Sequence, residues 1–131
     1  MPPATEHLAK AAHNRRVLGS LDLSQATDWA AVVAFYTALH QIERLADLDG
    51  RHHEQHNYRA VYLREHADHS QIWNDYLRLA TAASIARYQS LARFARFYPA
   101  TYVRRTLIDA HLVTIERYVE TVFAPPPNTG S

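Results

Sequence analysis

The sequence predicts an all-α protein, an antiparallel bundle of four or five helices. Glycine occurs only three times in 131 residues, and five of the six prolines lie near the two ends of the chain. Sandwiches and barrels need many glycine-rich turns, so we do not expect an all-β fold. Apolar residues instead recur at helical spacing. We expect a single domain over residues 1–123, followed by a disordered, proline-rich tail over residues 124–131.

The first helix is expected from Thr5, a good N-cap residue, to about Leu18, with Gly19 near its end. Its few apolar residues form only a thin stripe. This helix should therefore lie on the outside of the bundle.

The second helix is expected to begin at Thr27 or Asp28, either of which can cap it, and to end at Gly50, a suitable C-cap glycine. The segment from Trp29 to Leu39 contains no charged residue. A helix that is apolar on nearly every face belongs at the centre of a bundle.

A polar, histidine-rich stretch over residues 51–57 leads into a shorter helix around Tyr58. Ser70 is a reasonable N-cap for a fourth helix. Pro99 interrupts the pattern, because the residue before a proline is pushed out of the helical region. The last helix is expected from about Thr101, with one apolar face at α-helical spacing: Ile108, Leu112, Ile115, Val119 and Val122.

Composition narrows the function classes. The chain has no cysteine, which excludes disulfides, thiolate metal sites and a cysteine nucleophile. The N-terminus lacks the apolar core of a signal peptide and no stretch is long enough to span a membrane, so we expect a cytoplasmic protein without membrane contact. The formal net charge is only +1, which does not suggest a strongly basic nucleic-acid binder. Of the 14 basic residues, 13 are arginine, which suits recognition of phosphate or carboxylate.

The nine histidines are the compositional oddity. Five of them fall between residues 52 and 69, with Glu54 and Asp68 close by, and neutral imidazole is a good ligand for zinc, nickel or copper. No recognised metal signature is present, so a solvated polar segment is the competing interpretation. The residues concerned are His52, His53, His56, His66 and His69, with Glu54 and Asp68.

Arginine and histidine also occur at short separations, which suits metal-free cleavage of RNA, with arginine holding a phosphate and histidine moving protons. With these residue counts such pairs also arise by chance. In a regular α-helix Arg104 and His111, seven residues apart, share a face, whereas Arg105 and His111 do not. Arg51 and His56 form an alternative pair.

No glycine-rich phosphate loop and no serine nucleophile elbow is present, which excludes ATP hydrolysis and serine hydrolase chemistry. Late in the fourth helix, Arg87 and Tyr88 are candidates for a nucleotide groove, with arginine on phosphate and tyrosine stacked on a base. His40, one turn beyond Tyr36, is a candidate for an internal polar site.

The order of these features resembles the HEPN superfamily (higher eukaryotes and prokaryotes nucleotide-binding). The resemblance rests on Ala-Phe-Tyr-Thr-Ala-Leu-His at residues 34–40, then Gly50, His56 before a helix, and Ala-Arg-Tyr at residues 86–88. It spans about residues 5–122.

The resemblance implies a small helical bundle, usually a homodimer, found in toxin–antitoxin pairs, in defence systems and beside nucleotidyltransferases. Many members are metal-independent ribonucleases that use an Arg and a His with four to six residues between them, brought together across the dimer axis. Here it implies Arg104 or Arg105 on the scissile phosphate and His111 in acid–base work, although Thr106 and Val113 depart from the catalytic pattern. The residues implied in binding are Tyr36, His40, Arg59, Arg87 and Tyr88.

Three functions therefore compete. The first is a dimeric ribonuclease acting on RNA without a cofactor. The second is a non-catalytic module that binds a nucleotide or a protein partner such as an antitoxin. The third is a metal-binding bundle built on the histidines between residues 52 and 69.

Overall fold

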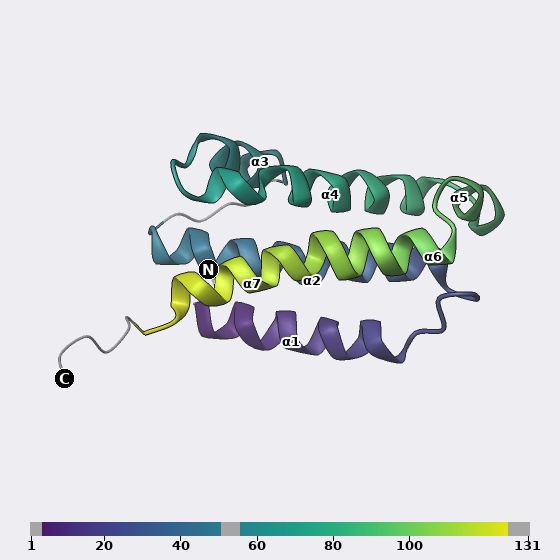
Figure 1. The fold of residues 1–131 in the computed structure, drawn as a ribbon, viewed down its shortest axis with the longest axis horizontal. Helices are drawn as coiled ribbons and strands as arrows, with labels where there is room; N and C mark the ends of the chain where they lie inside the picture. The colour runs from purple at the N-terminus through teal and green to yellow at the C-terminus, as the bar shows by residue number, and fades with distance from the viewer. Residues whose placement is uncertain (1–3, 51–55, 126–131) are drawn as a thin grey trace.

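The computed structural model describes residues 4–50 and 56–125, and every regular element in these two ranges is helical (Figure 1). No strand occurs in the described part of the chain, which confirms the predicted all-α class. The helices are α1 (Ala4–Ser20), α2 (Thr27–Leu48), α3 (His56–Glu65), η1 (His69–Ile72), α4 (Trp73–Tyr88), α5 (Leu91–Phe97), α6 (Ala100–Tyr102), η2 (Val103–Leu112) and α7 (Val113–Phe123).

α2 is the central helix, as its uncharged segment predicts, and most of its side chains are buried. It packs against α1, α4, η2 and α7, so it contacts the bundle on nearly every side. α1 buries only His7, Ala11 and Leu18, which agrees with its thin apolar stripe and its outer position (Figure 1).

The ends of α2 agree only in part with the sequence prediction. Gly50 has a φ of 72°, the left-handed conformation expected of a glycine that follows a helix end. At the other end the N-cap residue is Ala26, not Thr27 or Asp28. The Thr27 hydroxyl donates to the carbonyl of Leu23 instead, because Thr27 already lies inside the first turn.

The segment before α4 also differs from the prediction. Ser70 does not cap α4, because η1, one turn of 3₁₀ helix, occupies residues His69–Ile72 and α4 starts at Trp73. Past Tyr88 the chain turns through an extended Gln89, and the Ser90 side chain caps α5 by accepting from the N–H of Arg93. Pro99 then ends this segment, as predicted, and serves as the N-cap of α6.

η2 is a π-helix, whose hydrogen bonds run from residue i to residue i+5, where the apolar pattern predicts a regular α-helix. Its buried residues are separated by four, one and four positions, which places all of them on the core side of this wider helix: Val103, Leu107, Ile108 and Leu112. From Leu112 onward the buried positions Ile115 and Val119 return to α-helical spacing. The wider turn therefore joins two apolar stripes that one continuous α-helix cannot bury together.

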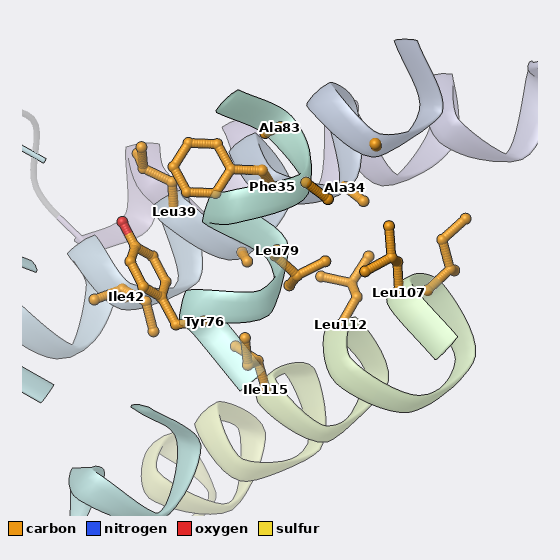
Figure 2. Packing of buried hydrophobic residues seen from close by; sticks show 14 of the residues in the cluster. Ala34, Phe35, Leu39, Ile42, Tyr76, Leu79, Ala83, Leu107, Leu112 and Ile115 are labelled. Atoms are coloured by element: carbon orange, nitrogen blue, oxygen red, sulfur yellow. The ribbon is translucent and has the colours of Figure 1, made fainter. Parts of the chain in front are cut away.

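The hydrophobic core lies between α2, α4 and the continuous rod formed by η2 and α7. Figure 2 shows Phe35 and Leu39 of α2 facing Tyr76 and Leu79 of α4, with Leu107, Leu112 and Ile115 closing the other side. The Phe35 and Tyr76 rings lie 5.7 Å apart between centroids. In α2, a series of alanines lets these helices approach closely.

None of the helices in residues 4–50 and 56–125 combines the length and the apolar character needed to cross a lipid bilayer.

Candidate nucleic-acid interface

The positive charge of this chain is concentrated in one segment. From Tyr76 to Ile108 the sequence holds six arginines and no aspartate or glutamate. The rest of the sequence holds the other eight basic residues and all 13 acidic residues. The near-neutral total therefore hides a strongly basic segment, and the sequence-based expectation of no basic footprint is wrong for this part of the molecule.

All six arginines of this segment are exposed: Arg78, Arg87, Arg93, Arg96, Arg104 and Arg105. Within the described residues none of them forms an ion pair with an acidic side chain. Figure 1 shows why five of them gather: the end of α4, then α5, α6 and the start of η2 lie together at one end of the bundle, where α2 begins. We call the surface formed by these five arginines the basic end: Arg87, Arg93, Arg96, Arg104 and Arg105.

Exposed aromatic rings are interleaved with these arginines. Tyr88 is 79% exposed and Phe97 is 68% exposed, values that are high for side chains of this size. Trp29, at the start of α2, is 63% exposed. Arginines that follow a phosphate backbone and aromatic faces on which bases stack are the two elements of a single-strand nucleic-acid surface.

A ladder of rings connects the basic end to the core. Buried Phe94 stacks on half-buried Tyr98 with centroids 4.9 Å apart and planes 10° apart, and Tyr98 meets exposed Tyr102 edge-on at 5.7 Å. Burial raises the pKa of the Tyr98 hydroxyl above its ordinary value, although the charge of Arg78 opposes this shift. The ladder ties short helices α5 and α6 to the core and so gives the basic end a fixed shape.

His111 lies on η2, and its Nδ1 is 2.8 Å from Oδ1 of Asp75, which is in the first turn of α4, at the other end of that helix from Arg87. Only about a sixth of each side chain is exposed (17% for both). A carboxylate at Nδ1 holds the proton there and leaves Nε2 as the ring atom that accepts a proton from a substrate. The pair thus has the arrangement of an acid–base group.

The π-helix changes the predicted relation of Arg104 to His111. Because a turn of η2 takes more residues than a turn of an α-helix, positions seven apart no longer superimpose on one face. Arg104 and Arg105 are exposed, whereas His111 is turned toward Asp75. Within one chain, therefore, the expectation that Arg104 and His111 share a face is wrong.

Of the residues predicted in binding, His40 and Arg59 make internal polar contacts, and Tyr36 is half-buried against the core beside Phe35. Arg59 is 8% exposed and pairs through its Nε with Glu43, which is 2% exposed. The hydroxyl of Tyr76 is buried close to this pair, and burial raises its pKa to about 12. An ion pair buried to this extent leaves no room for a ligand, so it joins α2 to α3 rather than forming a site.

His40 makes a second internal contact, with His7 of α1. Their Nδ1 atoms are 2.9 Å apart, so one ring donates the proton that the other accepts. Burial lowers the pKa of His40 to about 4, with the neighbouring His7 contributing, and burial also lowers the pKa of His7. Both rings are therefore neutral near pH 7, and the contact holds α1 against α2.

At the opposite end of the bundle, the predicted histidine-rich region forms one cluster within the described residues. His66 and His69 approach the same Oδ2 of Asp49, at 3.4 and 3.7 Å from their Nε2 atoms. Tyr62 donates to that oxygen at 2.5 Å, and the Tyr118 hydroxyl lies 2.5 Å from Nδ1 of His69. One carboxylate and two imidazoles within 4.8 Å of one another are a candidate metal set.

The orientation of the rings does not fit a metal ion. His66 and His69 are stacked, with centroids 3.7 Å apart and planes 10° apart. A metal ion bound to both rings would lie between the two ring planes, about half of that separation from each plane. The lone pair of an imidazole nitrogen points along the ring plane, and a zinc–nitrogen bond is only 2.0–2.1 Å long, so neither ring is oriented to bind such an ion. In addition, Nδ1 of His66 accepts the N–H groups of Asp68 and His69, so its Nε2 carries the proton.

A cavity of about 550 Å³ adjoins this cluster. It is lined by Asp49, Tyr58, Val61, Tyr62, Glu65, His66 and Ala67. Among the described lining residues, two are carboxylates and none is a lysine or an arginine, so this part of the lining does not attract phosphate. The cluster ties the end of α2 to α3, η1 and α7.

Several predicted residues fall outside the described part of the chain. Arg51, His52, His53 and Glu54 lie in residues 51–55, and the His56 side chain is likewise not described. The alternative pair of Arg51 and His56 is therefore still a prediction. Of the predicted binding residues, only Arg87 and Tyr88 lie at the basic end.

Sequence reasoning missed Trp29, Arg93, Arg96 and Phe97 as surface residues with a shared role. The signal was present in the acid-free run from Tyr76 to Ile108, which whole-chain charge averages away. Net charge counted over a window about as long as one helical hairpin, rather than over the whole chain, reveals this basic segment.

Comparison with known proteins found no matching family model, no matching curated protein and no matching solved structure.

Proposed function

We propose that this chain is a HEPN-like helical domain that binds single-stranded RNA at its basic end. The observation that carries the proposal is the acid-free segment from Tyr76 to Ile108, whose six arginines are all exposed beside exposed aromatic rings. Unpaired arginines attract a polyanion, and their ion pairs with phosphates release counterions.

Single-stranded rather than duplex nucleic acid is the better ligand. Tyr88 and Phe97 expose most of their ring surface, and a base can stack on such a ring only when it is free of a partner strand. Within the described residues no long helix projects from the basic end to enter a groove, since α5 has seven residues and α6 runs directly into η2 and α7, which pack along the bundle.

Fluorescence anisotropy with a labelled, unstructured RNA oligonucleotide tests binding across a salt series. For single strands the slope of log K against log salt is about −0.7 per neutralised phosphate. Replacing Arg93, Arg96, Arg104 and Arg105 by glutamine should weaken binding by at least about tenfold and reduce the slope toward zero.

The charge-matched control replaces four exposed basic residues outside the basic end by glutamine, and it should bind within about twofold of wild type: Lys10, Arg16, Arg64 and Arg117. Circular dichroism verifies that both variants stay folded. If the two variants bind RNA equally well, the basic end is not the interface.

A second function, metal-independent cleavage of that RNA, is favoured by the hydrogen-bonded pair of His111 and Asp75, since His111 shares η2 with Arg104 and Arg105 of the basic end. The 2′-oxygen would attack the phosphorus and give its proton to His111, while an exposed arginine holds the phosphate. The bond from phosphorus to the 5′-oxygen would break, leaving a 2′,3′-cyclic phosphate, and the 5′-oxygen would take a proton from water. An RNA cleavage assay in EDTA compares wild type, His111→Ala and His56→Ala, on protein whose oligomeric state is measured by light scattering.

Loss of cleavage with His111→Ala alone supports this assignment. Loss with His56→Ala alone moves the chemistry to the segment after Gly50. RNA that is bound and never cut leaves a non-catalytic binding module.

A further inference from the structure

A cleft at the basic end lies between the start of α2 and the end of α4. Its volume is about 460 Å³, within the range of small-molecule sites of roughly 300–1,000 Å³. The lining residues are Asp28, Trp29, Val32, Ala86, Arg87 and Gln89.

The cleft combines an apolar base with an aromatic wall. Val32 and Ala86 are 8% and 7% exposed, so they form the deep apolar part. Trp29 is 63% exposed, which leaves much of its indole surface uncovered although it stands over a hollow. A flat aromatic ligand fits such a cleft by stacking, and a nucleobase gains about 1–3 kcal/mol in this way.

The polar residues of the cleft differ in charge. Arg87 supplies a cation without an acidic partner among the described residues, which suits a phosphate. Asp28 supplies a carboxylate whose Oδ1 already accepts from the backbone N–H of Trp29 at 2.8 Å. That hydrogen bond orients the carboxylate beside the indole, and it leaves Oδ2 and the second lone pair of Oδ1 to accept from a ligand.

A carboxylate accepts hydrogen bonds and donates none, so it selects a base by its donors. Guanine presents N1–H and the N2 amino group side by side on one edge. Uracil presents a single N–H between two carbonyl oxygens, which a carboxylate repels. Adenine and cytosine each place an acceptor nitrogen beside one amino group.

We propose that this cleft is a guanine-selective base site, in which Trp29 stacks on the base, Asp28 accepts from its N1–H and N2 amino group, and Arg87 binds the adjoining phosphate. The proposal rests on the proposed RNA-binding function and adds the base that the surface selects. Gln89, at the rim, is available to the remaining polar atoms of the base.

The chain has only two tryptophans, and the other, Trp73, is half-buried. Trp73→Phe therefore gives a protein whose fluorescence reports Trp29 alone. Titrating this protein with each of the four nucleoside monophosphates should quench Trp29 with GMP at concentrations about tenfold lower than with UMP.

Asp28→Asn tests the carboxylate, because an amide donates as well as accepts. It should reduce the preference for GMP over UMP to within about twofold while Arg87 continues to bind phosphate. Asp109→Asn, an exposed aspartate outside the cleft, is the matched control and should retain the full preference.

Equal quenching by all four nucleotides, or a guanine preference that survives Asp28→Asn, overturns the base site even if RNA still binds the arginines. Guanine-selective quenching that depends on Asp28 supports it. If guanine-selective quenching depends on Asp28 but RNA binding is unaffected by replacement of the four arginines, the base site is supported and the wider RNA interface is contradicted.

Discussion

The contact between His7 and His40 makes the stability of this bundle sensitive to acid. In the unfolded chain His40 binds a proton at its ordinary pKa of 6.5, whereas in the folded protein its pKa is about 4, mainly because of burial. Between these two values the unfolded state binds more protons than the folded state. The free energy of unfolding therefore falls as the pH falls from about 6.5 to about 4.

The size of the effect follows from the two pKa values. The complete loss is about 3 kcal/mol below pH 4, and about 2 kcal/mol is already lost at pH 5. His40 is only partly enclosed, so solvent screening reduces the measured loss at pH 5 to about 1–2 kcal/mol. His7 shifts in the same direction and adds to it.

Urea unfolding followed by circular dichroism at about pH 7.5 and about pH 5 measures this loss in wild type and in His40→Gln. Glutamine can still hydrogen-bond to His7 and does not titrate, so the variant should lose about 1–2 kcal/mol less than wild type between the two conditions. His13→Gln, at an exposed position on α1, should behave like wild type. An unchanged pH dependence in His40→Gln would refute the assignment of this sensitivity to His40.

Two further predictions concern the polar clusters. Arg59→Met leaves Glu43 buried without its partner and should reduce the free energy of unfolding by about 3–5 kcal/mol, whereas the double variant Glu43→Leu/Arg59→Met should recover most of that loss in urea unfolding. A double variant no more stable than the single one would contradict this reasoning. At the other end, the stacked rings of His66 and His69 predict no stoichiometric zinc binding by tag-free protein after dialysis against zinc. One zinc per chain that disappears with His69→Ala would show that the rings rotate to bind metal.

Most of the helices could be predicted because their signals are local. The uncharged segment of α2, Gly50 after its end, and Pro99 each act within a turn or two of their own position. The prediction was wrong where burial in the core overrides the local preference for a regular α-helix. Ser70 lies in a 3₁₀ turn because Ile72 is drawn into the core, and η2 widens to a π-helix so that Leu107 and Leu112 are both buried.

The basic end is likewise a local property, because its five arginines all lie between residues 87 and 105 of the sequence. Its charge could have been found in the printed sequence, and its aromatic residues too. That Trp29 joins Arg87 in one cleft could not, since it depends on the start of α2 meeting the end of α4.

The sequence alone was sufficient to predict an all-helical chain with α2 at its centre, because helix periodicity and capping act over a few residues. The partners of the titratable side chains depended on the packing of helices distant in sequence. His7 and His40 are 33 residues apart, Asp75 and His111 are 36 apart, and His69 and Tyr118 are 49 apart. Contacts of this kind form when apolar faces are buried against one another, so the tertiary structure decided which partner each of these histidines has.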